Sequence, residues 1–190
     1  MKVLKFKNGD EMPVIGLGTW KSKKGEVGKA VKIAIENGYR HIDCAATYGN
    51  EAEIGEALAE IFEEGKVKRE DLWITSKLWN DSHLKQDVIP ALEKTLKDLQ
   101  LSYLDLYLIH WPVAFKPGVA FPEKDEDYLS LEEAPIGETW KMMLEAKALN
   151  MIRNVGVSNF SIPKLEDLIG ETNEIPEMNQ IELHPYLQQN

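Results

Sequence analysis

The stretch GYRHIDCAATYGNEAEIG, residues 38–55, contains the end of one predicted helix, a short strand and the start of the next helix. Gly38 ends a helix whose apolar residues recur at helical spacing over 27–35. A strand follows at 40–43. Asn50, with Glu53 three residues later, resembles a capping box that opens the next helix. Helix and strand therefore alternate here in quick succession.

The same alternation extends in both directions from this stretch. We expect an N-terminal hairpin through an Asn8-Gly9 turn, and five helices separated by strands at 14–18, 40–43, 72–76, 103–110, 154–157 and 178–183, with a long loop at 111–135. Strand–helix repeats imply right-handed βαβ units around a parallel sheet. That sheet is either an open doubly wound sheet or a closed (β/α)8 barrel. Gly16 and Gly18 lack the third glycine of a dinucleotide-binding turn, and a plain tight turn explains them equally well.

The composition is that of an ordinary globular chain, with 190 residues, of which 43% are hydrophobic and 28% charged. The formal net charge of −10 argues against a nucleic-acid partner, and no long apolar or polybasic segment marks a membrane protein. Cys44 is the only cysteine, so no intrachain disulfide can form. We therefore expect a reducing, cytoplasmic setting, and no signal peptide.

Polar side chains occur where the predicted strands end. Any one of them alone is more often a cap, a solvated residue or a hydrogen-bonded core residue than a catalytic group. In a barrel, however, all strands open with their carboxyl ends onto one face, where active sites lie. The residues that would meet there are Asp43, Tyr48, Lys77, His110, Ser158, Asn159 and Gln180.

Four of these residues make chemical sense as a proton-delivery device. A tyrosine titrates near ~10 in water, which is too high for efficient acid–base work at neutral pH. An ammonium group from Lys77 would stabilise the phenolate and lower the pKa of Tyr48, with Asp43 paired to the lysine. His110 would orient a carbonyl oxygen by hydrogen bonding.

Two other chemistries have weaker support. Cys44 adjoins the catalytic-looking stretch, but its alanine neighbours favour packing over a nucleophilic role. Asp43, His110, Glu182 and His184 are the residue types of a metal-dependent hydrolase barrel, yet no HxH or HExxH spacing supports that reading, and we expect no metal site.

Several motifs together resemble the aldo-keto reductase family, of the aldose/aldehyde reductase type. They are GLGTW (16–20), the stretch at 38–55, DLWITSKLW (71–79), LDLYLIHWP (104–112), IRNVGVSNF (152–160) and EMNQIELHPYLQQ (177–189). The resemblance implies a (β/α)8 TIM-type barrel whose bottom is closed by the N-terminal hairpin. It also implies reduction of an aldehyde or ketone, a small-molecule carbonyl substrate, by NADPH, with NADH as the other candidate cofactor.

The resemblance also implies roles for individual residues. Tyr48 would donate the proton, with Lys77 lowering its pKa, Asp43 paired to Lys77, and His110 orienting the substrate. Cofactor-binding residues would be Thr19, Trp20, Asp43, Ser158, Asn159 and Gln180. The substrate pocket would be lined by Trp20, Trp79, His110, Trp111, Phe115 and Phe121. For the tryptophans the alternative is core packing, but their placement just after strands one, three and four favours a pocket.

The length suggests an incomplete barrel. A full barrel uses ~250 residues for eight units, so 190 residues hold about six. We expect a C-terminally truncated barrel, with a hairpin at 1–14, strands one to six at 15–183 and a tail at 184–190. Its open edges would favour self-association into at least a dimer. The alternative to an enzyme is a non-catalytic or weakly active binding or scaffolding protein on a partial barrel.

Overall fold

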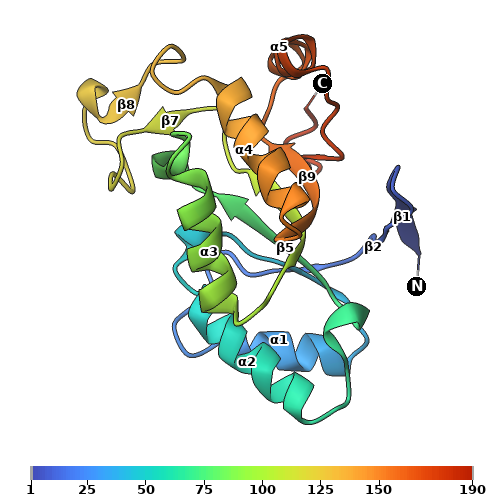
Figure 1. The fold of residues 1–190 in the computed structure, drawn as a ribbon. Coiled ribbons are helices and arrows are strands. Elements are labelled where there is room, and N and C mark those ends of the chain that lie inside the picture. The colour runs from blue at the N-terminus through green and yellow to red at the C-terminus, as the bar shows by residue number, and fades with distance from the viewer. Residues whose placement is uncertain (1, 190) are drawn as a thin grey trace.

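The computed structural model describes residues 2–189, and its centre is a six-stranded parallel sheet (Figure 1). The strands are β3 (Leu17–Gly18), β4 (His41–Asp43), β5 (Trp73–Leu78), β6 (Leu104–Ile109), β9 (Ile152–Ser158) and β10 (Asn179–Gln180). Their order across the sheet is β10-β9-β6-β5-β4-β3. Strands of this sheet that follow one another along the chain are therefore neighbours in it. The order confirms the predicted barrel type with six strands.

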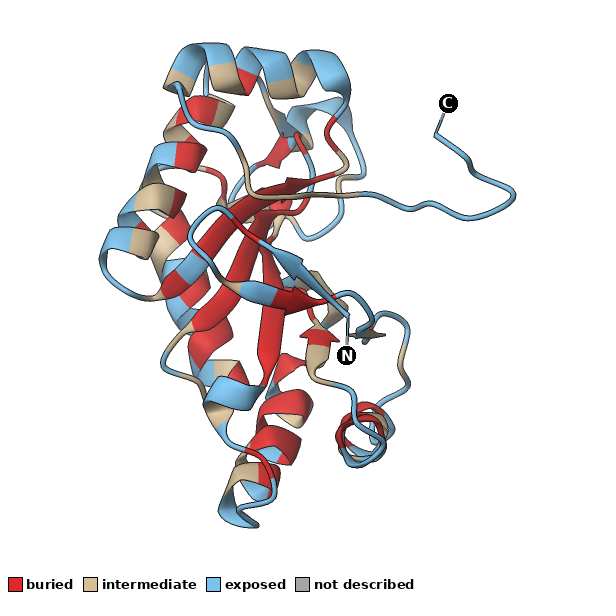
Figure 2. Cartoon of the chain, turned by 90° about the vertical axis from the view of Figure 1, so that its right-hand side faces the viewer, coloured by how far each residue is buried: buried red, intermediate tan, exposed pale blue. Residues whose placement is uncertain are grey.

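The helices lie on one side of this sheet and bury its main core. They are α1 (Val27–Glu36), α2 (Glu51–Glu63), α3 (Val88–Leu99), α4 (Ile136–Ala148) and α5 (Ile162–Thr172). Figure 2 shows that the central strands β5 and β6 are buried throughout, while α1 to α4 are buried mainly along the stripe that faces the sheet. Ile74, Tyr107 and Ile109 point to the helix side. This stripe is what the helical spacing of apolar residues predicts.

The opposite face of the sheet is covered at its amino end by the hairpin of β1 (Val3–Lys5) and β2 (Glu11–Pro13). Side chains of the hairpin and of alternate strand residues form a second, smaller core there, made of Phe6, Met12, Trp73, Leu106 and Leu108. The Phe6 ring meets the edge of Trp73 at 5.3 Å between centroids. The hairpin thus closes the bottom of the sheet, as the resemblance implies.

Two glycines allow backbone and side chains to approach closely. A Cβ on Gly16 would lie 2.8 Å from the His41 ring, and one on Gly55 would lie 2.2 Å from the Asp98 carbonyl oxygen, where α2 crosses α3. The second contact shows why only glycine fits at that helix crossing. Gly16 is explained by its contact with His41 and needs no phosphate-binding role.

Three expectations about local structure were wrong. Asn50 is the residue before α2, but its side chain donates to the Thr19 carbonyl instead of capping the helix. The Glu53 carboxylate accepts hydrogen bonds from Gly25 and Gly28. Both side chains are recruited by the neighbouring β3–α1 connection, so no capping box forms.

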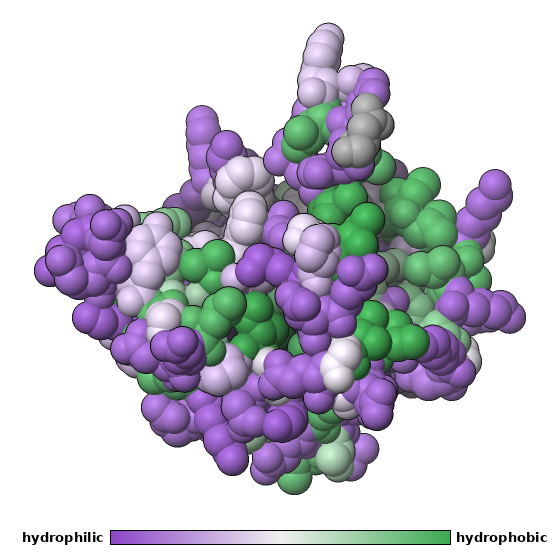
Figure 3. Space-filling model, turned by 90° about the horizontal axis from the view of Figure 1, so that it is seen from above, coloured by the Kyte–Doolittle hydropathy of each residue, from purple (hydrophilic) through white to green (hydrophobic). Residues whose placement is uncertain are grey.

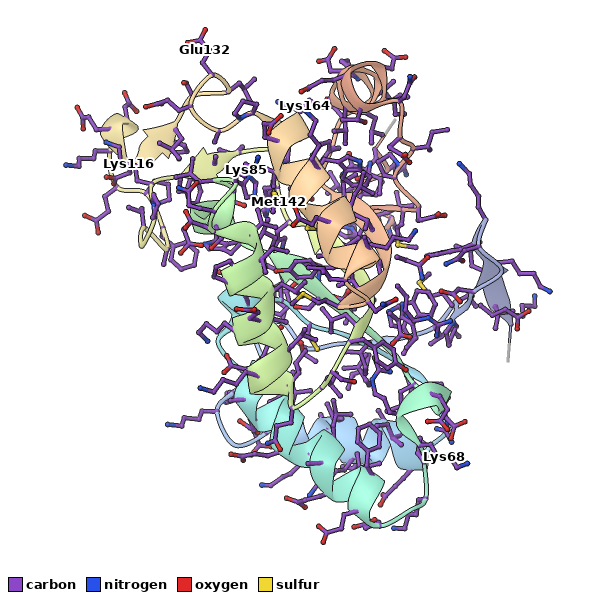
Figure 4. All side chains as sticks on the ribbon, viewed as in Figure 1. Lys68, Lys85, Lys116, Glu132, Met142 and Lys164 are labelled. Atoms are coloured by element: carbon purple, nitrogen blue, oxygen red, sulfur yellow. The ribbon has the colours of Figure 1, made fainter. Side chains whose placement is uncertain are left out.

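The other two differences concern the long loop and the last strand. The loop at 111–135 contains a small antiparallel sheet of β7 (Ala114–Phe115) and β8 (Tyr128–Leu129). Figure 4 shows Lys116 and Glu132 of this loop on its outer side, away from the main sheet. The last strand is β10 alone, shorter than the predicted 178–183, because only Asn179 and Gln180 pair with β9.

Within the described residues, β3 and β10 are the two edges of the sheet and each pairs with one neighbour. Exposed strand edges favour pairing with other chains. The expected self-association through these edges stays a prediction.

Candidate active site

Lys77 is the centre of the site. It lies on β5, on the face away from the helices, and is only 1% exposed. Its ammonium group donates to Asp43 Oδ2 at 2.7 Å, to the Cys44 carbonyl oxygen at 2.8 Å and to the Tyr48 hydroxyl at 3.2 Å. Burial lowers the pKa of Lys77, but Asp43 and Tyr48 together raise it by more than burial lowers it. The pKa of Lys77 is therefore above its ordinary value. Lys77 therefore stays charged.

Asp43 connects Lys77 to the edge of the sheet. One oxygen of its carboxylate accepts from Lys77, and the other, Oδ1, accepts from Gln180 Nε2 at 2.9 Å. Its carbonyl oxygen accepts from the Thr19 backbone and hydroxyl at 3.1 and 2.9 Å. Asp43 and Gln180, which are 137 positions apart in the sequence, are thus joined by a hydrogen bond across the open face of the sheet.

Tyr48 lies on a 3-10 turn, η1 (Ala46–Tyr48), directly after β4. Burial raises the pKa of its phenol above the ordinary value of 10.0, while the charge of Lys77 acts in the opposite direction. The expected lowering by Lys77 is present, but burial outweighs it. A phenol with a raised pKa is protonated at neutral pH, which suits a proton donor.

His110 completes the group at the carboxyl end of β6. Its ring lies 5.8 Å from the Tyr48 ring and 5.1 Å from the Trp79 ring, between centroids. Burial, followed by the nearby charge of Lys77 and by His83, lowers the pKa of His110 to about 3. The imidazole is therefore neutral and has one N–H to donate.

The residues at the ends of β9 and β10 bond to one another. Ser158 Oγ donates to the Gln180 carbonyl oxygen at 2.9 Å. Asn159 has a left-handed backbone with φ of 61°, and its Nδ2 donates to the His110 carbonyl and to Ser158 Oγ, both at 3.0 Å. Ser158, Asn159 and Gln180 thus form one polar group beside Asp43 and His110.

Aromatic side chains surround a pocket of about 350 Å³ next to this group. It contains four of the predicted substrate residues, Trp79, Trp111, Phe115 and Phe121. The Trp79 ring lies about 6 Å from both phenylalanines (6.0 and 5.9 Å between centroids). Seen from above, the surface of the molecule carries separate hydrophobic patches among hydrophilic residues (Figure 3).

Comparison with known proteins decides the family. The sequence model of the aldo/keto reductase family matches residues 14–190. An aldo/keto reductase from Synechocystis sp. is 54% identical over 189 residues, which are 100% of this chain and 58% of that protein. The chain belongs to the aldo/keto reductase family.

Other aldo/keto reductases give the same picture. Aldo-keto reductase family 1 member A1 from Homo sapiens is 52% identical over 184 residues, covering 96% of this chain and 57% of the relative. Aldose reductase from Schistosoma japonicum superposes with a TM-score of 0.91 at 47% identity, covering 97% of this chain and 62% of that structure. The chain therefore spans less than two thirds of the length of these relatives.

A further aldo/keto reductase, from Bombyx mori, was solved in complex with NADP and superposes with a TM-score of 0.89 at 40% identity, covering 99% of this chain and 60% of that one. The polar group of Ser158, Asn159 and Gln180 fits the carboxamide end of such a cofactor. It combines hydroxyl and amide groups that both donate and accept hydrogen bonds, which is what a carboxamide requires.

Most of the predicted site residues lie close together in the structure, but not all of them do. The structure brings Asp43, Tyr48, Lys77 and His110 together. Two of the predicted substrate residues, Trp20 and His110, do not line the aromatic pocket. Trp20 is 63% exposed, with its ring 6.4 Å from that of Tyr48, and His110 lies beside Trp79. Further lining residues that the sequence did not reveal are Asn80, Val113, Pro122 and Tyr128.

These additional residues had no usable sequence signal. Tyr128 reaches the pocket because β8 pairs with β7, which brings its ring within 5.2 Å of Phe115.

Cys44 is buried and free, and burial raises the pKa of its thiol well above the ordinary value, in keeping with packing.

Over residues 2–189, no three His, Cys, Asp or Glu side chains gather closely enough to hold a metal ion. In the same part of the chain, none of the helices is long and apolar enough to span a membrane.

Proposed function

We propose that this chain forms the proton-handling part of an NADPH-dependent carbonyl reductase that converts aldehydes or ketones to alcohols. The observation that carries the proposal is the buried Lys77 ammonium, which holds Asp43, the Cys44 carbonyl and Tyr48 within 2.7–3.2 Å. A permanently charged lysine beside a protonated phenol can stabilise the phenolate that forms when the proton leaves.

Each residue has a defined task in this reaction. NADPH, with NADH as the other candidate, supplies the hydride when bound. Tyr48 gives its phenolic proton to the carbonyl oxygen as that oxygen gains negative charge, and solvent later returns a proton to the phenolate. The charge of Lys77 stabilises the phenolate, and Asp43 keeps the lysine in place. His110 is neutral and donates its N–H to the same oxygen, which orients the carbonyl.

The remaining site residues bind the reactants. Ser158, Asn159 and Gln180 would hold the carboxamide of the nicotinamide, with Thr19 and Trp20 nearby. The pocket of Trp79, Trp111, Phe115 and Phe121 would receive the apolar body of the substrate. Such walls favour aldehydes with aromatic or aliphatic bodies, because their burial removes apolar surface from water.

The test is the substitution Tyr48→Phe, which removes the hydroxyl and keeps the ring. We expect aldehyde-dependent oxidation of NADPH, followed at its absorbance, to fall ~10²–10⁴-fold, the usual contribution of a positioned general acid. NADPH binding, followed by its fluorescence, should not change. Tyr128→Phe is the matched control, because that ring lines the pocket without contacting Lys77.

Retained turnover in Tyr48→Phe would refute the role of Tyr48. If the parent chain neither binds NADPH nor reduces any aldehyde, the non-catalytic binding or scaffolding function is the correct one.

A further inference from the structure

Glu51 is a buried carboxylate that the proposed reaction does not use. It is the first residue of α2 and only 4% exposed. Its two oxygens accept hydrogen bonds from two hydroxyl groups: Ser76 Oγ donates at 2.5 Å and Thr95 Oγ1 at 3.0 Å. A buried carboxylate is costly unless it is well bonded. We call these three residues the Glu51 bridge.

The Glu51 bridge lies directly behind the catalytic group. Glu51 follows Tyr48 by three residues, and Ser76 immediately precedes Lys77 on β5. Neighbouring strand residues point to opposite faces, so Ser76 faces the helices while Lys77 faces the site. The bridge therefore joins the segment that carries Tyr48 to the strand that carries Lys77, and Thr95 ties both to α3.

Asn50, the residue before Glu51, also holds this segment. Asn50 Nδ2 donates to the Thr19 carbonyl oxygen at 2.9 Å, and Thr19 in turn bonds to the Asp43 carbonyl. The hydroxyl of Tyr48 lies 3.2 Å from Lys77, at the long end of hydrogen-bond distances. A small displacement of the segment would break this contact.

We propose that Glu51 is a positioning residue for Tyr48, which it holds against Lys77 through the hydrogen bonds of the Glu51 bridge. The inference rests on the proposed function insofar as Tyr48 is the proton donor. It assigns a catalytic consequence to a residue that touches neither substrate nor cofactor.

The protonation of Glu51 changes the bridge. An ionised carboxylate accepts from both hydroxyls, whereas a protonated one must donate to one of them, which reverses that hydrogen bond. Burial raises the pKa of Glu51 to about 7, and the bonds from Ser76 and Thr95 partly oppose this. The bridge therefore switches between two hydrogen-bond arrangements near neutral pH.

Other ionisable groups surround Glu51. Asp98 on α3 raises the pKa of Glu51, and Lys94 on the same helix lowers it. The remaining groups are the buried side chains of Cys44 and Tyr107 and, along the groove that Glu51 lines, Asp81 and Asp87. Because Glu51 lines this groove, its proton can exchange with solvent.

The first experiment needs no turnover. The protein is labelled with ¹³C in its tyrosine rings, and the signal lost in Tyr48→Phe identifies Tyr48. In the parent, we expect this signal to shift between pH ~5 and ~9 with a midpoint near the pKa of Glu51. The midpoint should disappear in Glu51→Gln and persist in Glu56→Gln, a control at an exposed position of the same helix.

The second experiment separates binding from catalysis. We expect Glu51→Ala to lower kcat ~10-fold or more, because a displacement of about 1 Å can cost ~10²-fold. KM and the NADPH dissociation constant should not change. Glu51→Gln should restore kcat to within ~2-fold, because its amide can accept from Ser76 and donate to Thr95.

Two results overturn the proposal. One is a Tyr48 signal that does not move with pH in the parent, or whose midpoint survives in Glu51→Gln. The other is an unchanged kcat in Glu51→Ala together with an unchanged Tyr48 signal. A parent without turnover would defeat the proposed function alone, because the labelled-tyrosine experiment still tests the position of Tyr48. If Glu51→Ala does not fold, Ser76→Ala replaces it.

Discussion

Lys77 and His110, on β5 and after β6, are far more deeply buried than Gln180 on β10. Lys77 is 1% exposed and donates three hydrogen bonds, and its strand pairs with a neighbour on each side. Gln180 is half-buried on a two-residue strand that pairs only with β9 among the described residues. Asp43 bonds to both, through different oxygens.

This difference concerns how each part of the proposed site is held in place. The position of Lys77, and with it that of Tyr48, is determined by strand pairing and by the helix layer behind the sheet. Gln180 is held by its pairing with β9, by bonds from Ser158 and Asn159 to its carbonyl oxygen, and by its own bond to Asp43. The group proposed to handle the proton is therefore enclosed by more of the fold than Gln180 is.

The largest expected effect on stability comes from Lys77→Met. Methionine keeps most of the side-chain volume but leaves the Asp43 carboxylate and the Cys44 carbonyl without their donor. Breaking a buried ion pair costs ~3–5 kcal/mol. Because the Asp43 side chain is 18% exposed, we expect a loss near the lower end, about 3 kcal/mol, in denaturant unfolding.

The control is Lys94→Met, which breaks an ion pair with Asp98 whose lysine is 76% exposed. That loss should stay below ~1 kcal/mol. Equal losses in the two variants would show that burial does not distinguish the Lys77 group.

Glu51→Gln tests the same region from the helix side, through the pH dependence of stability. Burial raises the pKa of Glu51 from 4.5 to about 7, so the folded state keeps a proton that the unfolded chain releases above pH 4.5. The parent therefore loses stability as pH rises from 4.5 to 7, whereas glutamine does not titrate. We expect the unfolding free energy of Glu51→Gln to gain up to about 3 kcal/mol on the parent across this range.

Denaturant unfolding at pH ~4.5 and pH ~8 measures this difference. Glu56→Gln, exposed on the same helix, should show no such trend. A constant difference between Glu51→Gln and the parent at all pH values would contradict the raised pKa.

The smallest effect is expected for Gln180→Ala. The substitution removes one hydrogen bond to Asp43, which still bonds to Lys77, so the loss should be about 1 kcal/mol. Gln86→Ala, at an exposed position, is the control and should change the unfolding free energy by less than ~0.5 kcal/mol. A loss as large as that of Lys77→Met would remove the contrast between the two parts of the site.

Much of the site could be predicted because strand ends are a local signal. Lys77 directly follows the strand-like segment LWITS at 72–76, His110 follows a run of mainly apolar residues, and a barrel brings the carboxyl ends of its strands to one face. The spacing of apolar residues likewise predicted the helix that ends at Gly38. These features depend on short segments whose burial is evident from their own composition.

Other features depended on which segments meet in space. An acid in the first turn of a helix is usually exposed, and nothing near Glu51 in sequence reveals that Ser76 and Thr95 will enclose it. The capping box failed at Asn50 for the same reason, because Thr19 offers its carbonyl instead.

The amino-acid sequence alone determined the order of strands and helices and, through its resemblance to a known family, the barrel type. It also supplied the residue types of the proposed proton-delivery group. Only the tertiary structure decided that Asp43 bonds to Gln180, that Tyr128 lines the pocket and that burial outweighs Lys77 in the pKa of Tyr48. The physical reason is that strand and helix patterns arise from neighbours in the chain. Hydrogen-bond partners and desolvation, in contrast, depend on residues that lie far apart in sequence and meet only in the folded protein.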